Sequence, residues 1–244
     1  MLDRCASTHV ALKQGVDRRF ERDGKLPQSL LVLTEEQREG KGRRRPDWWS
    51  GPRSCNVAVS LMLPTPPQPP ETVGLHAACA VADALMPLLA QPSELALKWP
   101  NDILLGGAKI GGVLAEVSDR AGEGFALIGL GVNLLAAPPA DVAPYPTAAV
   151  GGLDRTAFVA AWLWALEKRL IGARRNGHQQ LEQDFLHYLR RWAPNGVLDP
   201  ATGHRGPLVE FSVQRGLTWG QKGDFLTHPL GWIPSLEALL SKES

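Results

Sequence analysis

The sequence is poor in the residues that hold disulfide-rich or metal-dependent folds together. Three cysteines occur among its 244 residues, Cys5, Cys55 and Cys79, and no two of them form a CxxC pair. They also give no metal-ligand spacing with the six histidines. We therefore expect neither a disulfide scaffold nor a zinc site. The chain is long enough to bury a hydrophobic core without them.

Long apolar runs and an excess of one charge are lacking as well. No run reaches the roughly 18 apolar residues that a membrane span needs, and the first ten residues contain no apolar signal-peptide core. The 26 Lys and Arg residues almost balance the 25 Asp and Glu residues, which leaves a net charge of +1. We expect a cytoplasmic protein that binds neither membranes nor nucleic acid in general.

What the sequence does contain is a succession of strand-like and helix-like segments, followed by a glycine-rich tail. We expect helices over 1–25, 71–89 and 156–192, with the last one broken or bent near Gly172 and Gly177. We expect strands over 30–33, 56–63, 94–98, 109–117 and 125–133. The fold class is therefore α+β, with a mixed β-sheet flanked by helices over 1–196 and a small β appendage over 197–244.

Residues 37–50, QREGKGRRRPDWWS, combine glycine, cationic and aromatic side chains in one polar segment. The glycines would let the backbone approach a ligand closely, while Lys41 and the three consecutive arginines at 43–45 would offer cationic donors. The two tryptophans could cover a flat ring or exclude water. This composition fits a loop that becomes ordered around a polyphosphate, and it also fits a solvated basic loop.

Residues 97–102, LKWPND, place a lysine between apolar residues at the end of a strand. A cation in such surroundings needs an anionic partner, so Lys98 could hold a carboxylate or a phosphate. Pro100 ends the strand, and Asp102 in the following turn could hold a metal ion or orient a base. The alternative is a plain turn with a Lys98 side chain that reaches solvent and an Asp102 that caps the turn.

Two glycine-containing segments follow, KIGGVLAE at 109–116 and IGLGVN at 128–133. Gly129 and Gly131 occupy alternate positions of one strand, which leaves one of its faces without side chains. A flat group could lie against that bare backbone. The alternative is close packing of the strand on a helix. The pattern is not a dinucleotide fingerprint, because the third glycine and the following helix are missing.

Taken in this order, the segments resemble the catalytic core of biotin protein ligases. That family has a Ser-Thr-Asn start, a glycine- and arginine-rich loop that ends in Trp, a Lys-Trp-Pro-Asn-Asp turn, a Lys-x-Gly-Gly-x-Leu-x-Glu strand and a Gly-x-Gly-x-Asn strand. The corresponding residues are 7–9, 40–48, 98–102, 109–116 and 129–133. KWPND followed by KIGGVLAE is the specific pair, since one segment alone would not identify the family.

The resemblance implies an ATP-dependent ligase. Such an enzyme forms biotinyl-5′-AMP from biotin and ATP, with Mg²⁺ at the phosphates, and then transfers biotin to a lysine of a biotin carboxyl carrier domain of an acyl-CoA carboxylase. It also implies an SH3-like fold for the C-terminal appendage and a monomer or homodimer. No helix-turn-helix module precedes Ser7, so the resemblance is to the short form without a DNA-binding domain.

By position in the motifs, the resemblance also assigns site residues. Lys98 would hold the biotin carboxylate and the charge that develops at the phosphate, and Arg43 would be a second catalytic cation. The residues implied for biotin are Ser7, Thr8, Gln37, Gly40, Lys41, Lys98, Gly129 and Gly131. Those implied for ATP are Arg43, Arg45, Trp48, Asn101, Asp102, Lys109 and Asn133, and Asp102 is also the implied metal ligand.

The chain departs from the family pattern at three places. Lys41 stands where the family has its first loop arginine, which keeps the charge but loses the bidentate geometry. Arg45-Pro46 stands where the family has a Gly-Arg pair, and His9 stands where it has asparagine. The first two changes lie in the loop that the resemblance places over the adenylate, so they bear on how that loop closes.

Two other functions compete with the ligase. A lipoate or octanoate ligase or transferase shares the implied fold, but its usual motif lacks the pairing of the KWPND turn with a glycine- and arginine-rich loop. A non-catalytic protein that binds biotin or an adenylate would account for an altered loop. It would not require Lys98, Asp102 and Asn133 together.

Overall fold

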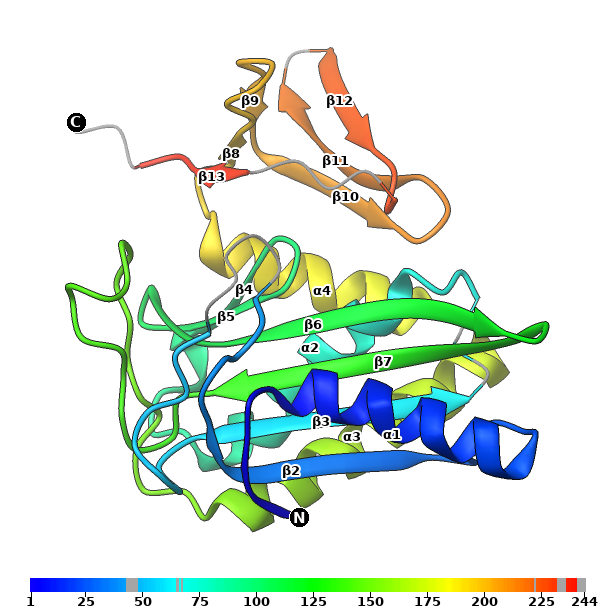
Figure 1. Ribbon diagram of the computed structural model, residues 1–244. Coiled ribbons are helices and arrows are strands. Elements are labelled where there is room, and N and C mark those ends of the chain that lie inside the picture. The colour runs from blue at the N-terminus through cyan, green and yellow to red at the C-terminus, as the bar shows by residue number, and fades with distance from the viewer. Residues whose placement is uncertain (43–47, 65, 67, 222, 232–235, 241–244) are drawn as a thin grey trace.

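The computed structural model describes residues 1–42, 48–64, 66, 68–221, 223–231 and 236–240, and it confirms the α+β fold class (Figure 1). A seven-stranded sheet lies at the centre, in the order β1-β2-β3-β7-β6-β5-β4. Only the β1–β2 pair is parallel among these neighbours. The strands are β1 (Leu2–Cys5), β2 (Leu30–Gln37), β3 (Val57–Pro64), β4 (Leu95–Lys98), β5 (Asp102–Leu105), β6 (Ala108–Arg120) and β7 (Glu123–Val132).

The two faces of this sheet are covered unequally (Figure 1). Helix α1 (Thr8–Asp23) packs on one face, and α2 (Thr72–Leu85), α3 (Arg155–Asn176) and α4 (Gln179–Trp192) pack on the other. The larger hydrophobic core lies under α2, α3 and α4, and a smaller core lies under α1. None of the helices described is long and apolar enough to cross a membrane.

Strand β7 shows how the sheet divides its faces. Its residues Ala126, Ile128 and Leu130 belong to the larger core, while Phe125 and Leu127 belong to the smaller core under α1. Successive side chains of a strand point to opposite faces, so the series that begins with Phe125 and Leu127 continues at Gly129 and Gly131. The α1 face therefore changes from packed core to bare backbone along one strand.

Several local expectations need correction. The helix expected over 1–25 begins only at Thr8, because Leu2–Cys5 forms β1 and pairs with the distant β2. Strand β5, which lies directly after the KWPND turn, was not expected. The long C-terminal helix breaks at Gly177, whose φ is +74°, but it continues through Gly172 without interruption. Long-range pairing explains β1, whereas β5 pairs with its chain neighbours β4 and β6 and is too short to be marked by a pattern of its own.

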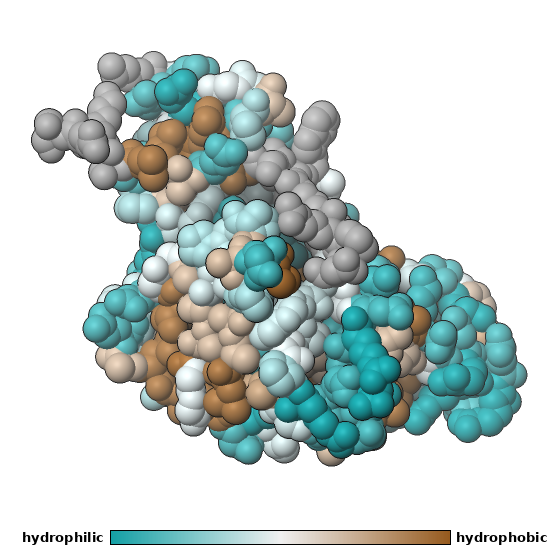
Figure 2. All heavy atoms as spheres, turned by 60° about the vertical axis from the view of Figure 1, so that its left-hand side comes forward, coloured by the Kyte–Doolittle hydropathy of each residue, from teal (hydrophilic) through white to brown (hydrophobic). Residues whose placement is uncertain are grey.

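The end of the chain forms two small antiparallel sheets, β10-β11-β12 and β13-β8-β9. Their strands are β8 (Val197–Leu198), β9 (Arg205–Gly206), β10 (Leu208–Ser212), β11 (Gly216–Gln221), β12 (Asp224–His228) and β13 (Glu237–Ala238). They project from the main body (Figure 2), yet Phe211 and Trp219 belong to the same core cluster as α4. A β appendage is thus confirmed, and its boundary at 196/197 stays a prediction.

Candidate active site

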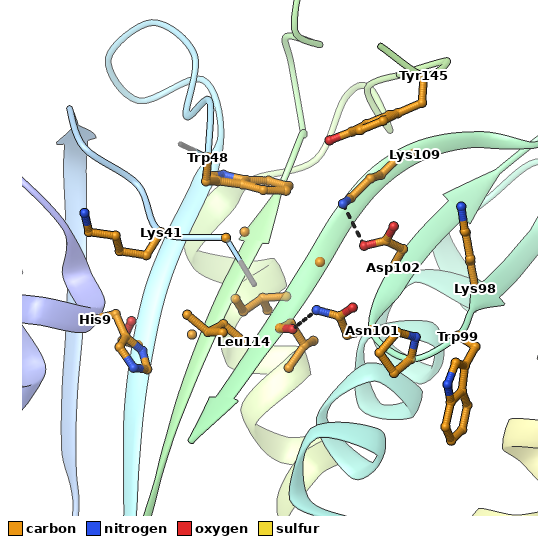
Figure 3. A pocket seen from close by; sticks show the side chains of 18 of the residues that line it. His9, Lys41, Trp48, Lys98, Trp99, Asn101, Asp102, Lys109, Leu114 and Tyr145 are labelled. Carbon is orange, nitrogen blue, oxygen red and sulfur yellow. Dashed lines mark hydrogen bonds and ion pairs between the residues drawn. The ribbon is translucent and has the colours of Figure 1, made fainter. Parts of the chain in front are cut away.

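A cavity of about 630 Å³ lies on the α1 face of the sheet, where α1 begins and β7 turns bare. Its walls come from the start of α1, from β2, β3, β6 and β7, from the KWPND turn and from β13 (Figure 3). The residues expected from sequence that line it are Ser7, Thr8, Gln37, Lys41, Trp48, Lys98, Asn101, Asp102, Lys109, Gly129 and Gly131. The motifs are therefore brought together around one cavity.

Two of the expected residues that the structure describes, Gly40 and Asn133, do not line it, and two others cannot be placed. Arg43 and Arg45, together with Pro46, lie outside the described residues. Gly40 lies at the base of the loop, where its carbonyl accepts from the backbone N–H of Trp48 at 2.8 Å. Asn133 is 2 % exposed, and its Nδ2 donates to the carbonyl of Ala148. Asn133 thus ties a neighbouring loop to the sheet.

The inner end of the cavity is lined by uncharged hydroxyl and amide groups. Ser60 Oγ donates to Thr8 Oγ1 at 3.0 Å, and Thr8 Oγ1 donates to Gln37 Oε1 at 3.1 Å. The backbone N–H of Thr8 also donates to Gln37 Oε1, at 2.8 Å, while Gln37 Nε2 donates to Ser50 Oγ. Gln37 therefore fixes the direction of the Thr8 hydroxyl. Ser7 Oγ is buried and has no hydrogen-bond partner among the described residues.

The bare backbone of β7 is covered by an aromatic ring. A Cβ atom added to Gly131 would lie 2.4 Å from Trp48 Cε2, so only glycine allows the indole to lie this close. A Cβ atom on Gly129 would meet His9 Nδ1 at 3.2 Å and Ser60 Oγ at 3.6 Å. The flat group expected against these glycines is thus, in part, the protein's own Trp48.

The opposite end of the cavity is charged. Lys98 ends β4, and its Nζ lies 5.8 Å from the centre of the Trp192 ring. Within the described part of the chain, no carboxylate lies within 4 Å of this ammonium group. A half-buried cation without a carboxylate partner favours a bound anion, because the ammonium has been partly removed from water.

A second lysine stands beside it. Lys109 Nζ forms an ion pair with Asp102 Oδ1 at 2.6 Å, and it lies 5.6 Å from the Trp48 ring and 5.2 Å from the Tyr145 ring (Figure 3). Asn101 holds the turn in place, because its Nδ2 donates to the carbonyl of Val113 at 2.6 Å. The two lysines, the two aromatic rings and the carboxylate form a compartment suited to a nucleotide phosphate and its base.

Trp99 connects this turn to the C-terminal sheets. The indole is 3 % exposed, and its ring centre lies 5.9 Å from that of Phe185 in α4 and 6.1 Å from that of Phe211 in β10. Phe185 and Phe211 also contact each other, at 5.1 Å. Since Trp99 adjoins Lys98 in the chain, the C-terminal sheets support the position of Lys98 from behind.

The donor set for a metal ion is small. Among the described residues, no three His, Cys, Asp or Glu side chains are grouped so that they could hold an ion. Asp102 is the expected ligand, and it is paired with Lys109. One carboxylate is nevertheless a normal protein contribution to Mg²⁺, which takes its remaining ligands from substrate phosphates and water.

Some lining residues were missed in the sequence. Ser60 is a polar residue inside an apolar strand, a signal that alternation along the strand could have revealed. Tyr145 lies in a loop, and Leu236 and Glu237 lie about 100 residues beyond the last motif, so nothing local marks them. His9 was noted as a departure from the family pattern, but its place in the cavity wall was not expected.

Comparison with known sequences places these motifs in one family. The biotin/lipoate A/B protein ligase family matches residues 6–133. The biotin--[acetyl-CoA-carboxylase] ligase of Mycobacterium tuberculosis is 35% identical over 164 residues, which cover 64% of this chain and 59% of that protein. The ligase of the same name from Paracoccus denitrificans is 40% identical over 121 residues, 47% of this chain and 48% of that protein. The matches thus span about half to three fifths of these relatives.

Comparison with solved structures agrees on the fold. The biotin protein ligase of Aquifex aeolicus, solved in complex with biotin and ATP, superposes with a TM-score of 0.77 over 98% of this chain and 97% of that chain, at 20% identity. The Helicobacter pylori enzyme solved with bound biotinylated ATP gives a TM-score of 0.63 at 21% identity. Because the family match covers more than half of the sequence and includes every motif around the cavity, this chain belongs to the biotin/lipoate A/B protein ligase family.

Proposed function

We propose that this chain is an ATP-dependent biotin protein ligase that acts in two steps, adenylation of biotin and transfer of biotin to a carrier lysine. The observation that carries the proposal is the division of one cavity into a neutral polar end at Thr8 and a cationic end at Lys98. A substrate with a polar ring at one end and a carboxylate at the other matches this division.

The polar end favours biotin over the other acids of the family. The ureido ring of biotin carries two N–H donors and one carbonyl acceptor, whereas the dithiolane ring of lipoate and the alkyl chain of octanoate carry none. Within the part of the chain that the structure describes, Ser7 Oγ is buried without a partner and Ser60 Oγ donates to Thr8 while accepting from no group. Buried hydroxyls left unpaired by an apolar ligand would lower its affinity, by about 1–3 kcal/mol for each group.

The cationic end suits the first step. A carboxylate oxygen of biotin attacks the α-phosphorus of ATP, a new P–O bond forms, and the bond to the β-phosphate oxygen breaks to release pyrophosphate. Both reactants are anions, so their approach and the charge that develops at phosphorus both need nearby cations. Lys98 has no carboxylate partner among the described residues and is placed to supply that charge. Lys109 and Trp48 would position the nucleotide.

The second step needs a dry site. The amine of a carrier lysine attacks the carbonyl carbon of the biotinyl adenylate, the amide bond forms, AMP leaves, and the amine loses its proton. Water would compete for the same carbon. Trp48, which lies on Gly131 and closes the base of the loop at Gly40, covers this part of the cavity. Its position would keep water from the anhydride.

Magnesium and the acceptor complete the proposal. Mg²⁺ would neutralise phosphate charge when bound, with Asp102 as the protein carboxylate available to hold it. The acceptor would be the lysine of a biotin carboxyl carrier domain of an acyl-CoA carboxylase, in line with the printed names of the two relatives above. We expect the reaction in the cytoplasm, where ATP is supplied, and from a monomer or a homodimer.

The test is exchange of labelled pyrophosphate into ATP, measured with biotin, lipoate or octanoate as the acid. We expect exchange with biotin alone. Exchange with only lipoate or octanoate would instead assign the chain to the acyl ligases of the family, and folded protein without exchange for any acid would indicate a binding protein. Transfer is then measured with an isolated carrier domain and with its acceptor lysine replaced by arginine as the control.

A further inference from the structure

Glu237 is a carboxylate in the cavity wall whose charge no described residue neutralises. Among the described residues, two carboxylates line the cavity, Asp102 and Glu237. Asp102 forms the ion pair with Lys109. Glu237 is exposed, and no Lys, Arg or His side chain in the described part of the chain lies within 4 Å of its carboxylate. Of these two carboxylates, only Glu237 is therefore available to a substrate that enters the cavity.

Glu237 joins the cavity wall from the C-terminal sheets, on the same side as Lys98. Its strand, β13, pairs with β8, where Glu237 stands opposite Leu198. Strand β8 begins a few residues after Trp192, the last residue of α4, whose ring centre lies 5.8 Å from Lys98 Nζ. The preceding residue, Leu236, is 2 % exposed and belongs to the larger core, so the strand is held in place. The exposed carboxylate thus borders the cationic end of the cavity from the solvent side.

The transfer step needs a group that accepts a proton. As the bond between the amine nitrogen and the carbonyl carbon forms, the nitrogen becomes acidic and has to lose a proton. The described cations of the cavity wall are Lys41, Lys98 and Lys109, and an ammonium group has no acceptor. Because Asp102 is already paired with Lys109, Glu237 is the charged group of the described wall that is left to take this proton.

We propose that Glu237 is the general base of the transfer step, which accepts a hydrogen bond from the amine of the carrier lysine and takes its proton as the amide forms. The proposal rests on the proposed function, which supplies the adenylate and the carrier. The carrier lysine first loses one proton to solvent, which the lysines around the cavity favour because they repel an ammonium group. The neutral nitrogen then bonds to the carbonyl carbon, the bond from that carbon to the phosphate oxygen breaks, and its electron pair leaves with AMP. The second proton passes from the nitrogen to Glu237 and from there to solvent, which the exposed side chain reaches.

The test compares the two half-reactions in one variant. Glu237→Gln keeps the size of the side chain and the backbone pairing of β13, but it cannot take a proton. We expect the maximal rate of biotin transfer from preformed biotinyl adenylate to a carrier domain to fall about 10²-fold, the usual contribution of a general base. Pyrophosphate exchange with biotin should stay unchanged, and Glu237→Asp should restore part of the transfer rate. Glu210→Gln is the matched control, because Glu210 on β10 pairs with Arg215 outside the cavity, and both rates should stay unchanged in it.

Hydroxylamine gives a second readout. This small amine is already uncharged at neutral pH and attacks anhydrides readily, so it needs no base from the protein. Its capture of the bound adenylate should proceed at the same rate in the unaltered protein and in Glu237→Gln. A parallel loss of hydroxylamine capture and carrier transfer would mean that Glu237 acts on the adenylate rather than on the amine, and would overturn the proposal.

The other outcomes separate this role from the ligase proposal. Unchanged transfer in Glu237→Gln, with exchange intact, would overturn the role of Glu237 and leave the ligase proposal standing. An equal loss of exchange and transfer would overturn it as well, because Glu237 would then act in adenylation or hold Mg²⁺. A higher KM for the carrier domain at an unchanged maximal rate would reduce Glu237 to a docking contact. Absence of biotin-dependent exchange in the unaltered protein would overturn the ligase proposal, and the role of Glu237 with it.

Discussion

The two faces of the central sheet are built for different purposes. On the face under α2, α3 and α4, side chains such as Ile128 and Leu130 are buried in one large apolar core. On the face under α1, a small apolar core gives way to glycine backbone and to polar atoms without partners, such as Ser7 Oγ. Neighbouring residues of β7 therefore point alternately into the core and toward the cavity. Substitutions at these positions should separate effects on stability from effects on activity.

The largest effect should come from Lys98, at the cationic end of the site. Lys98→Ala removes the cation that we propose acts on the developing phosphate charge, and removal of one such group costs about 10²–10³-fold in rate. We expect pyrophosphate exchange to fall by at least this factor. The unfolding temperature should stay nearly unchanged, since Lys98 has no ion-pair partner among the described residues. Exchange retained within tenfold would remove Lys98 from its assigned role.

A pair of substitutions in β7 tests the division between the faces directly. Ile128→Ala removes core volume and should lower the free energy of unfolding by about 2–5 kcal/mol, with kcat of the remaining folded protein little changed. Gly131→Ala places a methyl group against Trp48 and should lower activity about tenfold or more with a smaller loss of stability. Chemical denaturation and exchange assays on both variants give the comparison. Equal effects on both properties would contradict it.

A smaller effect is expected from the neutral end of the site. Thr8→Val keeps the shape of the side chain but removes the hydroxyl that links Ser60 to Gln37. We expect the Kd for biotin to rise about tenfold, the effect of one or two hydrogen bonds, while the KM for ATP stays unchanged. Calorimetry and steady-state kinetics measure the two constants. A parallel change in both would mean that the two ends of the cavity are not independent.

The effect that is smallest at neutral pH concerns the opposite face of the sheet, because it develops only as the pH falls. Burial lowers the pKa of His76 in α2 from its ordinary 6.5 to about 3, so the folded protein holds this imidazole neutral. Above about pH 6.5 this imidazole is neutral in both states and costs no stability. As the pH falls toward 3, the unfolded chain takes up a proton that the folded protein does not, so the free energy of unfolding decreases by up to about 1.4 kcal/mol per pH unit. Urea unfolding of the unaltered protein and of His76→Leu at several pH values should show a shallower slope for the variant.

The sequence predicted the fold class, and most of the residues expected at the site line one cavity, because the motifs lie on strands that are close in the chain. The KWPND turn and the strands 109–117 and 125–133 form one continuous antiparallel run, so their residues meet once those strands pair. What could not be predicted depends on distant contacts. Strand β1 exists through its pairing with β2, and Tyr145 enters the cavity from a loop without a pattern of its own.

The sequence also could not predict which side-chain amide groups are already hydrogen-bonded within the protein. Gln37 and Asn133 carry amides that could each bind a ligand. In the structure Gln37 Oε1 accepts from the Thr8 hydroxyl and Asn133 Nδ2 donates to the Ala148 carbonyl, while Asn133 Oδ1 is buried without a partner among the described residues. A sequence shows which donors and acceptors exist, and only the packed structure shows which of them are already used. The unused atoms of Ser7 and His9 stand out for the same reason.

The contact between Trp99 and Phe211 has a consequence for the order in which the protein becomes active. A chain emerges from the ribosome from its N-terminus, and the motif residues up to Asn133 are made well before Phe211 and Glu237. Until those later residues arrive, the indole beside Lys98 lacks one of its two aromatic neighbours and the cavity lacks part of its wall. The cavity proposed as the ligase site should therefore stay incomplete on a nascent chain until its synthesis is almost finished.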